Sequence, residues 1–305
     1  MIYTITFAPS LDYVINTSKS FDNNGLNRIN DYYFLPGGKG INASVILKRL
    51  GLNNKAITFI GGFSGEKIKT LINNEGIEII DIETDEDTRI NVKYNDGQNQ
   101  FEINGPRSKI TDKQSKKYFD ILSEITSNDF VFVMGLSDFD LLEKTLKHLS
   151  SKNIKFALDV DTDRINELLK YKPLSIKPNI YEIKNILGFV PDSLEIIKEA
   201  LISIKKKGVS IPIISNGKEG SYYLDENNDL IKSTIKKRIN VVSAVGAGDT
   251  LLSSLIGFLI LNNSYSESIK KATAMSIGTV LTPWLAESDD QEKYYDLVDL
   301  TKINF

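Results

Sequence analysis

Short apolar segments with the pattern of β-strands alternate along this chain with segments of helical spacing. Expected strands lie at 2–7, 55–60, 130–133 and 156–160, and most of the stretches between them favour helices. Strands joined through helices run mainly parallel, and the helices cover both faces of the sheet. We therefore predict a single α/β domain over residues 1–305, with ligands bound at the carboxyl ends of the strands.

Two segments interrupt the alternation, at about 12–35 and 88–104. Both read as strands with no helix between them. The second contains Asp96 and Gly97 between two alternating runs, and an Asp-Gly pair in that setting is typical of a β-hairpin turn. We expect the two segments to form a small separate β-sheet that covers the strand ends as a lid or pairs with another subunit.

The composition excludes several kinds of chemistry. The chain has no cysteine, which removes disulfides, thiolate nucleophiles and cysteine-bound metals. Its single histidine, His148, has no nucleophile at catalytic spacing, so a carboxylate or a lysine is the expected proton acceptor. A net charge of −3 argues against nucleic acid as a partner. The apolar runs are shorter than the ~20 residues of a membrane span, and the N-terminus lacks the basic flank of a signal peptide, so we expect a cytoplasmic protein.

Residues 245–250 read Val-Gly-Ala-Gly-Asp-Thr and lead into an apolar helix. Gly246, Ala247 and Gly248 let a ligand approach the backbone closely, and free amides at a helix N-terminus bind anions. Asp249 then has two possible roles. It could cap the helix, or it could take the proton from an attacking hydroxyl while the amides hold a phosphoryl group.

Residues 36–42 read Pro-Gly-Gly-Lys-Gly-Ile-Asn and also lead into a helix. The small residues around Lys39 suit close packing against a sugar or its phosphate. The spacing does not fit the phosphate-binding loop Gly-x-x-x-x-Gly-Lys-Ser/Thr. By itself, the stretch could equally be an ordinary glycine turn with a solvated lysine.

Two further stretches each follow a strand. Residues 177–182 read Lys-Pro-Asn-Ile-Tyr-Glu and are expected to enter a helix. Asn179 and Glu182 stand three apart and could bind Mg²⁺ through waters. A helix capping box has the same spacing and is the favoured interpretation of that pair alone. Residues 214–220, Ile-Ser-Asn-Gly-Lys-Glu-Gly, form a strand-end turn that is a weak signal by itself.

These four stretches, in this order, resemble the ribokinase-like carbohydrate kinases of the PfkB family over nearly the whole chain. Residues 246–249 match the C-terminal signature of the family, and residues 37–40 with Asn42 match the N-terminal one. The two together are highly specific, although either alone is weak. The segments 8–12, 61–65, 88–93 and 102–106 look like the branch that acts on phosphosugars, and Thr-Arg-Ile-Asn-Val-Lys at 88–93 is especially similar to 1-phosphofructokinases.

The resemblance implies a three-layer α/β/α sandwich with a β-sheet lid, which in this family often also builds a homodimer. It implies ATP-dependent phosphorylation of fructose 1-phosphate to fructose 1,6-bisphosphate, with ATP and Mg²⁺ as cofactors. Kinases of tagatose 6-phosphate or fructose 6-phosphate are alternatives within the family, and a sugar-phosphate sensor without catalysis is an alternative outside it. A nicotinamide enzyme is disfavoured because no Gly-x-Gly-x-x-Gly follows the first strand.

The resemblance also implies roles for individual residues. Asp249 would be the base, and Gly246, Ala247 and Gly248 would form the anion hole. The expected substrate-binding residues are Asp12, Arg28, Gly37, Gly38, Lys39, Asn42, Arg89 and Asn104, with Lys39, Arg89 and Arg28 on the existing phosphate. Lys177, Asn179, Ser215, Gly217 and Gly220 would bind the nucleotide, and Asn179 and Glu182 would order Mg²⁺ through water.

The chain departs from the family pattern at three places. Residues 134–138 read Met-Gly-Leu-Ser-Asp where the family usually has Ser-Gly-Ser-Leu-Pro, so Leu136 replaces a hydroxyl that commonly contacts substrate. Residues 243–244 are Ser-Ala in place of Asn-Thr, and residues 159–162 are Asp-Val-Asp-Thr in place of Asp-Thr-Ser-Gly. These changes bear on substrate preference and rate, because the residues that carry the chemistry are retained.

Overall fold

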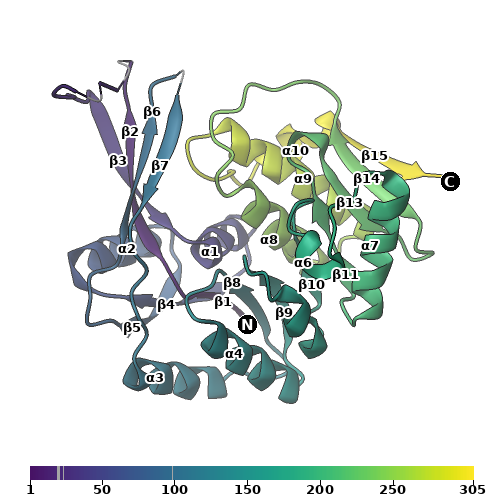
Figure 1. Cartoon of the computed structure of the whole chain (residues 1–305), viewed down its shortest axis with the longest axis horizontal. Helices are drawn as coiled ribbons and strands as arrows, with labels where there is room; N and C mark the ends of the chain where they lie inside the picture. The colour runs from purple at the N-terminus through teal and green to yellow at the C-terminus, as the bar shows by residue number, and fades with distance from the viewer. Residues whose placement is uncertain (19–20, 23, 98) are drawn as a thin grey trace.

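A computed structural model describes residues 1–18, 21–22, 24–97 and 99–305 (Figure 1). Its centre is a seven-stranded sheet in which every neighbouring pair is parallel, which confirms the predicted fold class. In spatial order its strands are β11 (Ile211–Pro212), β10 (Ser175–Ile176), β9 (Lys155–Asp159), β8 (Phe130–Met134), β1 (Ile2–Thr6), β4 (Asn54–Ile60) and β5 (Glu78–Glu83).

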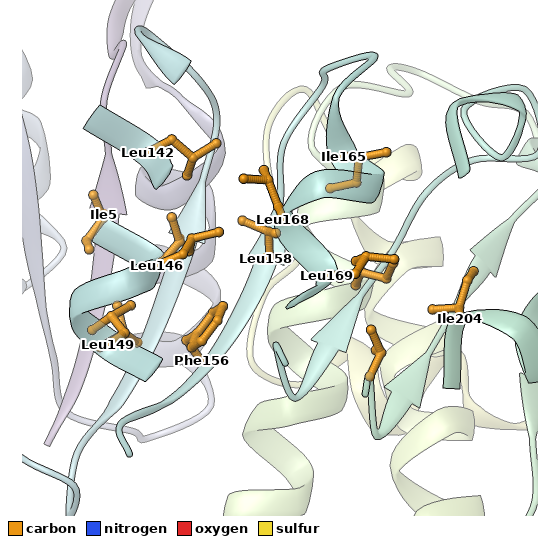
Figure 2. Packing of buried hydrophobic residues seen from close by; sticks show 14 of the residues in the cluster. Ile5, Leu142, Leu146, Leu149, Phe156, Leu158, Ile165, Leu168, Leu169 and Ile204 are labelled. Atoms are coloured by element: carbon orange, nitrogen blue, oxygen red, sulfur yellow. The ribbon is translucent and has the colours of Figure 1, made fainter. Parts of the chain in front are cut away.

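Helices cover both faces of this sheet. Successive side chains of a strand point to opposite faces, so Val131 and Val133 of β8 pack in one core and Phe130 and Phe132 in the other. The first core is covered by α3 (Asp112–Ser123), α4 (Phe139–Ser151), α5 (Ile165–Leu168), α6 (Lys184–Leu187) and α7 (Leu194–Lys206). Figure 2 shows this layer, with Leu142, Leu146 and Leu149 of α4 close to Ile5 and Phe156.

The second core is covered by α1 (Lys39–Arg49), α2 (Gly62–Asn74), α8 (Ala247–Ile260) and α9 (Tyr265–Leu281). The short helix α10 (Asp290–Lys293) contacts α9. No helix in the described part of the chain is both long enough and apolar enough to cross a bilayer.

A second, antiparallel sheet continues from the β11 edge in the C-terminal half. It contains β12 (Ile214–Ser215), β13 (Ser221–Leu224), β14 (Leu230–Ile235) and β15 (Val298–Ile303). Of these strands, sequence patterns predicted only the segment around β12, because the later ones mix polar and apolar residues. The 236–246 connection leads from β14 across to the N-terminus of α8.

The two segments that interrupt the alternation form a third sheet, as predicted. Its order is β3 (Asp31–Gly37), β2 (Ser10–Asn16), β6 (Ile90–Asn95) and β7 (Gln100–Asn104). The β6–β7 pair is the expected hairpin, and it joins β2 through a parallel β2–β6 pairing. Figure 1 shows this sheet, called the lid below, projecting away from the main body on the side where β1 and β8 end.

Candidate active site

Asp249 lies in the first turn of α8, at the carboxyl-end edge of the main sheet. Gly246 precedes the helix with a φ of 80°, and a Cβ there would stand 2.8 Å from Leu285 Cδ2, so this tight entry requires glycine. Asp249 is the third helical residue and makes no cap, so the capping alternative is wrong. The amides of residues 247–249 belong to the first turn, which has no intrahelical acceptors for them.

The Asp249 carboxylate is buried and held by one neutral hydrogen bond. Asn42 Nδ2 of α1 donates to Asp249 Oδ2 at 2.8 Å. Burial and the neighbouring Asp159 carboxylate raise the pKa of Asp249, while Lys39, the Asn42 hydrogen bond and Lys177 lower it, and together they bring it to about 6. A carboxylate with this pKa is ionised at neutral pH yet basic enough to accept a proton from a hydroxyl during reaction.

The start of α1 presses closely on β1, which places Lys39 and Asn42 beside Asp249. Gly38 has a φ of 128°, and a Cβ there would stand 2.7 Å from Thr6 Cγ2. A Cβ on Gly40 would lie 2.6 Å from the carbonyl oxygen of Ile5. Gly38 and Gly40 therefore allow the start of α1 to pack closely against β1. This packing brings the side chains of Lys39 and Asn42 to the site.

Two cavities meet at Asp249. The first, of about 750 Å³, lies between the lid and the main body. The second, of about 1030 Å³, lies between the second sheet and the N-terminus of α8. Asp249, Lys39 and Ala244 line both cavities. A group bound in one cavity can therefore react with a group bound in the other at this junction.

The first cavity contains nearly all the predicted substrate-binding residues. They are Asp12, Gly37, Gly38, Lys39, Asn42, Arg89 and Asn104. Asp12 accepts hydrogen bonds from Ser10 Oγ at 2.7 Å and Asn91 Nδ2 at 3.0 Å, and Lys93 Nζ lies 3.5 Å from its other oxygen. A Cβ on Gly37 would stand 2.6 Å from Asp12 Oδ1, so glycine at 37 leaves room for this carboxylate.

One end of the first cavity is cationic. Arg89 donates from Nε to the Pro9 carbonyl at 3.2 Å and from Nη2 to the Ala8 carbonyl at 3.0 Å. Burial lowers the pKa of Arg89, and the nearby Arg107 guanidinium lowers it further. Neither arginine forms an ion pair within the described residues, and both line the cavity. Two neighbouring guanidinium groups without an ion-pair partner suit a bound phosphate, although the Asp12 carboxylate acts on Arg89 from a greater distance.

The second cavity contains the residues predicted to bind the nucleotide: Lys177, Asn179, Ser215, Gly217 and Gly220. Asn179 Oδ1 accepts from the amides of Tyr181 and Glu182, both at 2.9 Å, and Glu182 Oε2 accepts from the Asn179 amide at 2.8 Å. This is the capping-box arrangement. It organises a turn, and the expected helix begins only at Lys184.

A cluster of charged side chains, in which Asp159 and Lys177 are buried and Lys39 is partly exposed, joins the two cavities. Lys39 Nζ lies 2.7 Å from Asp159 Oδ1, and Lys177 Nζ lies 3.4 Å from Asp159 Oδ2. Burial would lower the pKa of Lys39, but Asp159 and Asp249 raise it above its ordinary value. Lys39 is expected on the substrate's existing phosphate; the structure places it at the junction, where it lines both cavities, and that role stays a prediction.

Sequence reasoning differs from the structure at several further residues. Arg28 lies exposed in the β2–β3 connection and lines neither cavity. Asn91 and Lys93, which contact Asp12, were missed. They follow Arg89 at every second position of a predicted strand, so the period of two was a usable signal. Asp159 carried no such signal. Arg107 lies outside this alternation, but a scarce arginine near a glycine is itself a signal for a phosphate site. Leu136, which replaces a hydroxyl residue of the family pattern, lines the first cavity, where a residue that contacts substrate is expected.

Residues 6–289 match the pfkB family of carbohydrate kinases. The chain belongs to this family. It is 30% identical over 296 residues to the 1-phosphofructokinase of Borreliella burgdorferi, with 96% of each chain covered. It is 29% identical to the D-tagatose-1-phosphate kinase of Bacillus licheniformis, over 99% of this chain and all of the other.

The fold of this kinase also matches a solved structure, that of phosphofructokinase-2 from Escherichia coli in complex with substrates and products. The TM-score is 0.90 with 24% sequence identity, over 97% of this chain and 98% of the other. At that identity the match shows the fold alone. The predicted ribokinase-like sandwich and the predicted class of enzyme, a phosphotransferase with an alcohol group as acceptor, are thus both confirmed.

Proposed function

We propose that this kinase transfers the γ-phosphoryl group of Mg-ATP to the free primary hydroxyl of fructose 1-phosphate, yielding fructose 1,6-bisphosphate and ADP. The observation that carries the proposal is the position of Asp249 at the junction of the two cavities. The first cavity also has a cationic end, formed by Arg89 and Arg107, that suits the phosphate already on the sugar. The 1-phosphofructokinase relative supports the same acceptor.

In the proposed reaction, Asp249 accepts the proton of the acceptor hydroxyl as its oxygen attacks the γ-phosphorus. The bond from that phosphorus to the bridging oxygen of ADP breaks, and the proton stays on the carboxyl group until it passes to solvent. Gly246 lets the chain enter α8 tightly, and the amides of Gly248 and Asp249 in its first turn would donate to the transferring oxygens. The Ala247 amide would join them by giving up its 3.4 Å hydrogen bond to the Ala244 carbonyl. Lys39 neutralises charge at the same point.

The remaining first-cavity residues would fix the acceptor. Asp12, Gly38 and Asn42 would hold sugar hydroxyls, and Arg89 with Arg107 would hold the phosphate. Asn104 and Gly37 line the same space. The lid would exclude water from the junction, which limits hydrolysis of ATP. One contact already joins the lid to the main body, because Gln100 Nε2 of β7 donates to the Val242 carbonyl at 3.3 Å.

We assign Mg-ATP to the second cavity. Ser215, Gly217 and Gly220 line it from the β12 turn, and Lys177 reaches the first turn of α8, where its Nζ stands 2.8 Å from a Cβ built on Gly248. Glu182 lines the cavity and uses only Oε2 in its cap, so Oε1 remains for a water of a bound cation. Glu182 would hold Mg²⁺ through such a water, and the cation would neutralise charge on the phosphates. Asn179 would act by fixing this turn, because its Oδ1 already accepts from two amides.

A specific observation favours a second acceptor, D-tagatose 1-phosphate, because a kinase named for that substrate is 29% identical over the full length. The deciding experiment is ADP release with Mg-ATP against fructose 1-phosphate, tagatose 1-phosphate, fructose 6-phosphate, tagatose 6-phosphate and free fructose. We expect kcat/KM for fructose 1-phosphate to exceed that for the 6-phosphates by about tenfold or more. Preference for a 6-phosphate would overturn the acceptor, and phosphate binding without transfer would indicate a sensor.

We predict that kcat/KM for the acceptor falls tenfold per pH unit below about pH 6. The pKa of Asp249 is raised to about 6, and a protonated carboxyl cannot accept the proton, so activity is lost as pH decreases through that value. Because phosphate monoesters also titrate near pH 6, the control is the profile of residual activity in Asp249→Asn. In that variant, only the titration of the substrate's phosphate should remain in the pH profile. An identical profile in both proteins would contradict the assignment of Asp249 as the proton acceptor.

Two expectations from the sequence stay predictions. Pairing of two subunits through the lid is supported by its exposed apolar side chains, including Tyr32 at 54% and Ile103 at 60% exposure. Analytical ultracentrifugation would report the state of assembly. The second expectation is a cytoplasmic location, where ATP and phosphosugars occur together.

A further inference from the structure

Asp159 is a buried carboxylate at the junction that the reaction above does not use. It ends β9, a central strand, and its register partner across the sheet is Met134 of β8. Its carbonyl accepts from the Gly135 amide at 2.9 Å, which ties the 134–136 loop to it. The backbone of Asp159 is therefore held by β8 and its following loop, and the preceding residue Leu158 pairs with Ile176 of β10 on the other side.

Both oxygens of Asp159 contact lysines from different parts of the chain. Lys39 comes from the first turn of α1, and Lys177 follows β10. Within the described residues, Oδ2 has no hydrogen-bond partner, so the 3.4 Å ion pair to Lys177 is its main compensation. Burial would raise the pKa of Asp159, but Lys177 and Lys39 lower it below the ordinary value, so the group stays ionised.

Two lysines and three carboxylates surround the junction. Lys39 and Lys177 provide two positive charges, and Asp159 and Asp249 provide two negative ones. Glu182 acts on Lys39 from the capped turn. Without Asp159, the two ammonium groups would lose their shared counter-ion, and Asp249 would be the carboxylate that still acts on both. A lysine paired with the base would block the position that the acceptor hydroxyl must occupy.

We infer that Asp159 is a positioning residue that holds the ammonium groups of Lys39 and Lys177 between the two cavities, where they can follow the γ-phosphoryl group during transfer. This inference rests on the proposed function. An alternative is that Asp159 forms only a structural ion pair, which would affect the stability of the fold and leave the rate of transfer unchanged. The two differ in what the isosteric variant Asp159→Asn does to kcat.

The test compares Asp159→Asn with the wild-type enzyme at saturating substrates. We expect kcat to fall by ~10- to 100-fold, because small misplacements of catalytic groups cost rates of that size. Binding of a non-hydrolysable ATP analogue should change by no more than about threefold, since both lysines keep their charge. The acid limb of kcat/KM should move to lower pH, because Asp249 loses a negative neighbour. Asp163→Asn, an exposed change in the same loop, is the matched control.

A wild-type kcat with an unshifted acid limb in Asp159→Asn would overturn the inference. If that variant does not fold, Asp159→Glu takes its place, because it keeps the charge and displaces it by one methylene. The Glu variant should lose ~10-fold or more in kcat with its acid limb unmoved, and a wild-type kcat there would overturn the positioning role.

The acceptor used in this comparison comes from the panel described above. If the wild-type enzyme prefers another phosphosugar, the proposed substrate fails, and the positioning role is then decided on that acceptor by the same outcomes. If the wild-type enzyme transfers phosphate to no acceptor, both proposals fail together. The wild-type panel therefore decides the proposed substrate before any variant is made, and the Asp159 variants then decide the positioning role.

Discussion

Asp249→Asn is expected to lower kcat by ~10² to 10⁴-fold while ATP still binds. The side chain stays in place, because an amide oxygen at 249 can accept the hydrogen bond that Asn42 Nδ2 now donates to Asp249 Oδ2. What is lost is the proton acceptor at the junction of the two cavities. Steady-state kinetics with Mg-ATP and the preferred phosphosugar, together with calorimetric binding of an ATP analogue, measure the two effects separately.

The stability of this variant is a useful check on that interpretation. The pKa of Asp249 is raised from 3.8 to about 6, so its relative contribution to stability is fully present only below about pH 4 and is lost as the pH rises through 6. Replacing the ionised group by a neutral amide at pH 7.5 should therefore leave Tm unchanged or raise it. A low rate with a lowered Tm would point to misfolding, and near-normal turnover would refute the base assignment. Asp163→Asn again provides the matched surface control.

Patterns in the chain predicted six of the seven strands of the main sheet, because the buried parallel strands are nearly continuous apolar runs. The edge strand β5 (Glu78–Glu83) was missed, because acidic and apolar residues alternate in it and most of it is not fully buried. They predicted the lid because strand patterns at 12–35 and 88–104 lack intervening helices. The second sheet was missed beyond β12. In β13, which is buried throughout, Ser221 and two tyrosines stand where a core strand would usually have aliphatic residues. Ser221 Oγ and Tyr223 Oη satisfy each other by a hydrogen bond, so this polar composition is compatible with burial.

The candidate site was predictable where a local motif carries it. The glycines before Lys39 and Asp249 mark two helix starts, and both starts reach the junction. The role of Asp159 depends instead on contacts with Lys39, 120 residues earlier in the chain, and with Lys177 across a neighbouring strand. Arg107 follows a proline in an irregular segment, and its proximity to Arg89 identifies it as the second cation of the proposed phosphate site. Such tertiary pairs have no periodic signature for sequence reasoning to detect.

Arg89→Ala is expected to raise KM for the phosphosugar by ~10- to 100-fold, with kcat changed by no more than a few-fold. This is the size expected for losing hydrogen bonds between a guanidinium and a phosphate, which are worth about 1.5–3 kcal/mol. KM for ATP should stay the same, since Arg89 lines only the first cavity. Arg164→Ala is the matched control, because Arg164 is an exposed arginine whose ion pair with Glu167 lies outside both cavities.

Free fructose distinguishes a phosphate contact from a structural one in the Arg89 variant. Arg89 also donates to the carbonyls of Ala8 and Pro9, which support the connection between β1 and the lid. If the guanidinium binds phosphate, KM rises for fructose 1-phosphate and stays constant for fructose, so the discrimination between the two acceptors shrinks. If the guanidinium only stabilises the connection between β1 and the lid, KM rises for both acceptors and Tm falls. An unchanged KM for the phosphosugar would remove Arg89 from the phosphate site and leave Arg107 and Lys93 as the cations that could replace it.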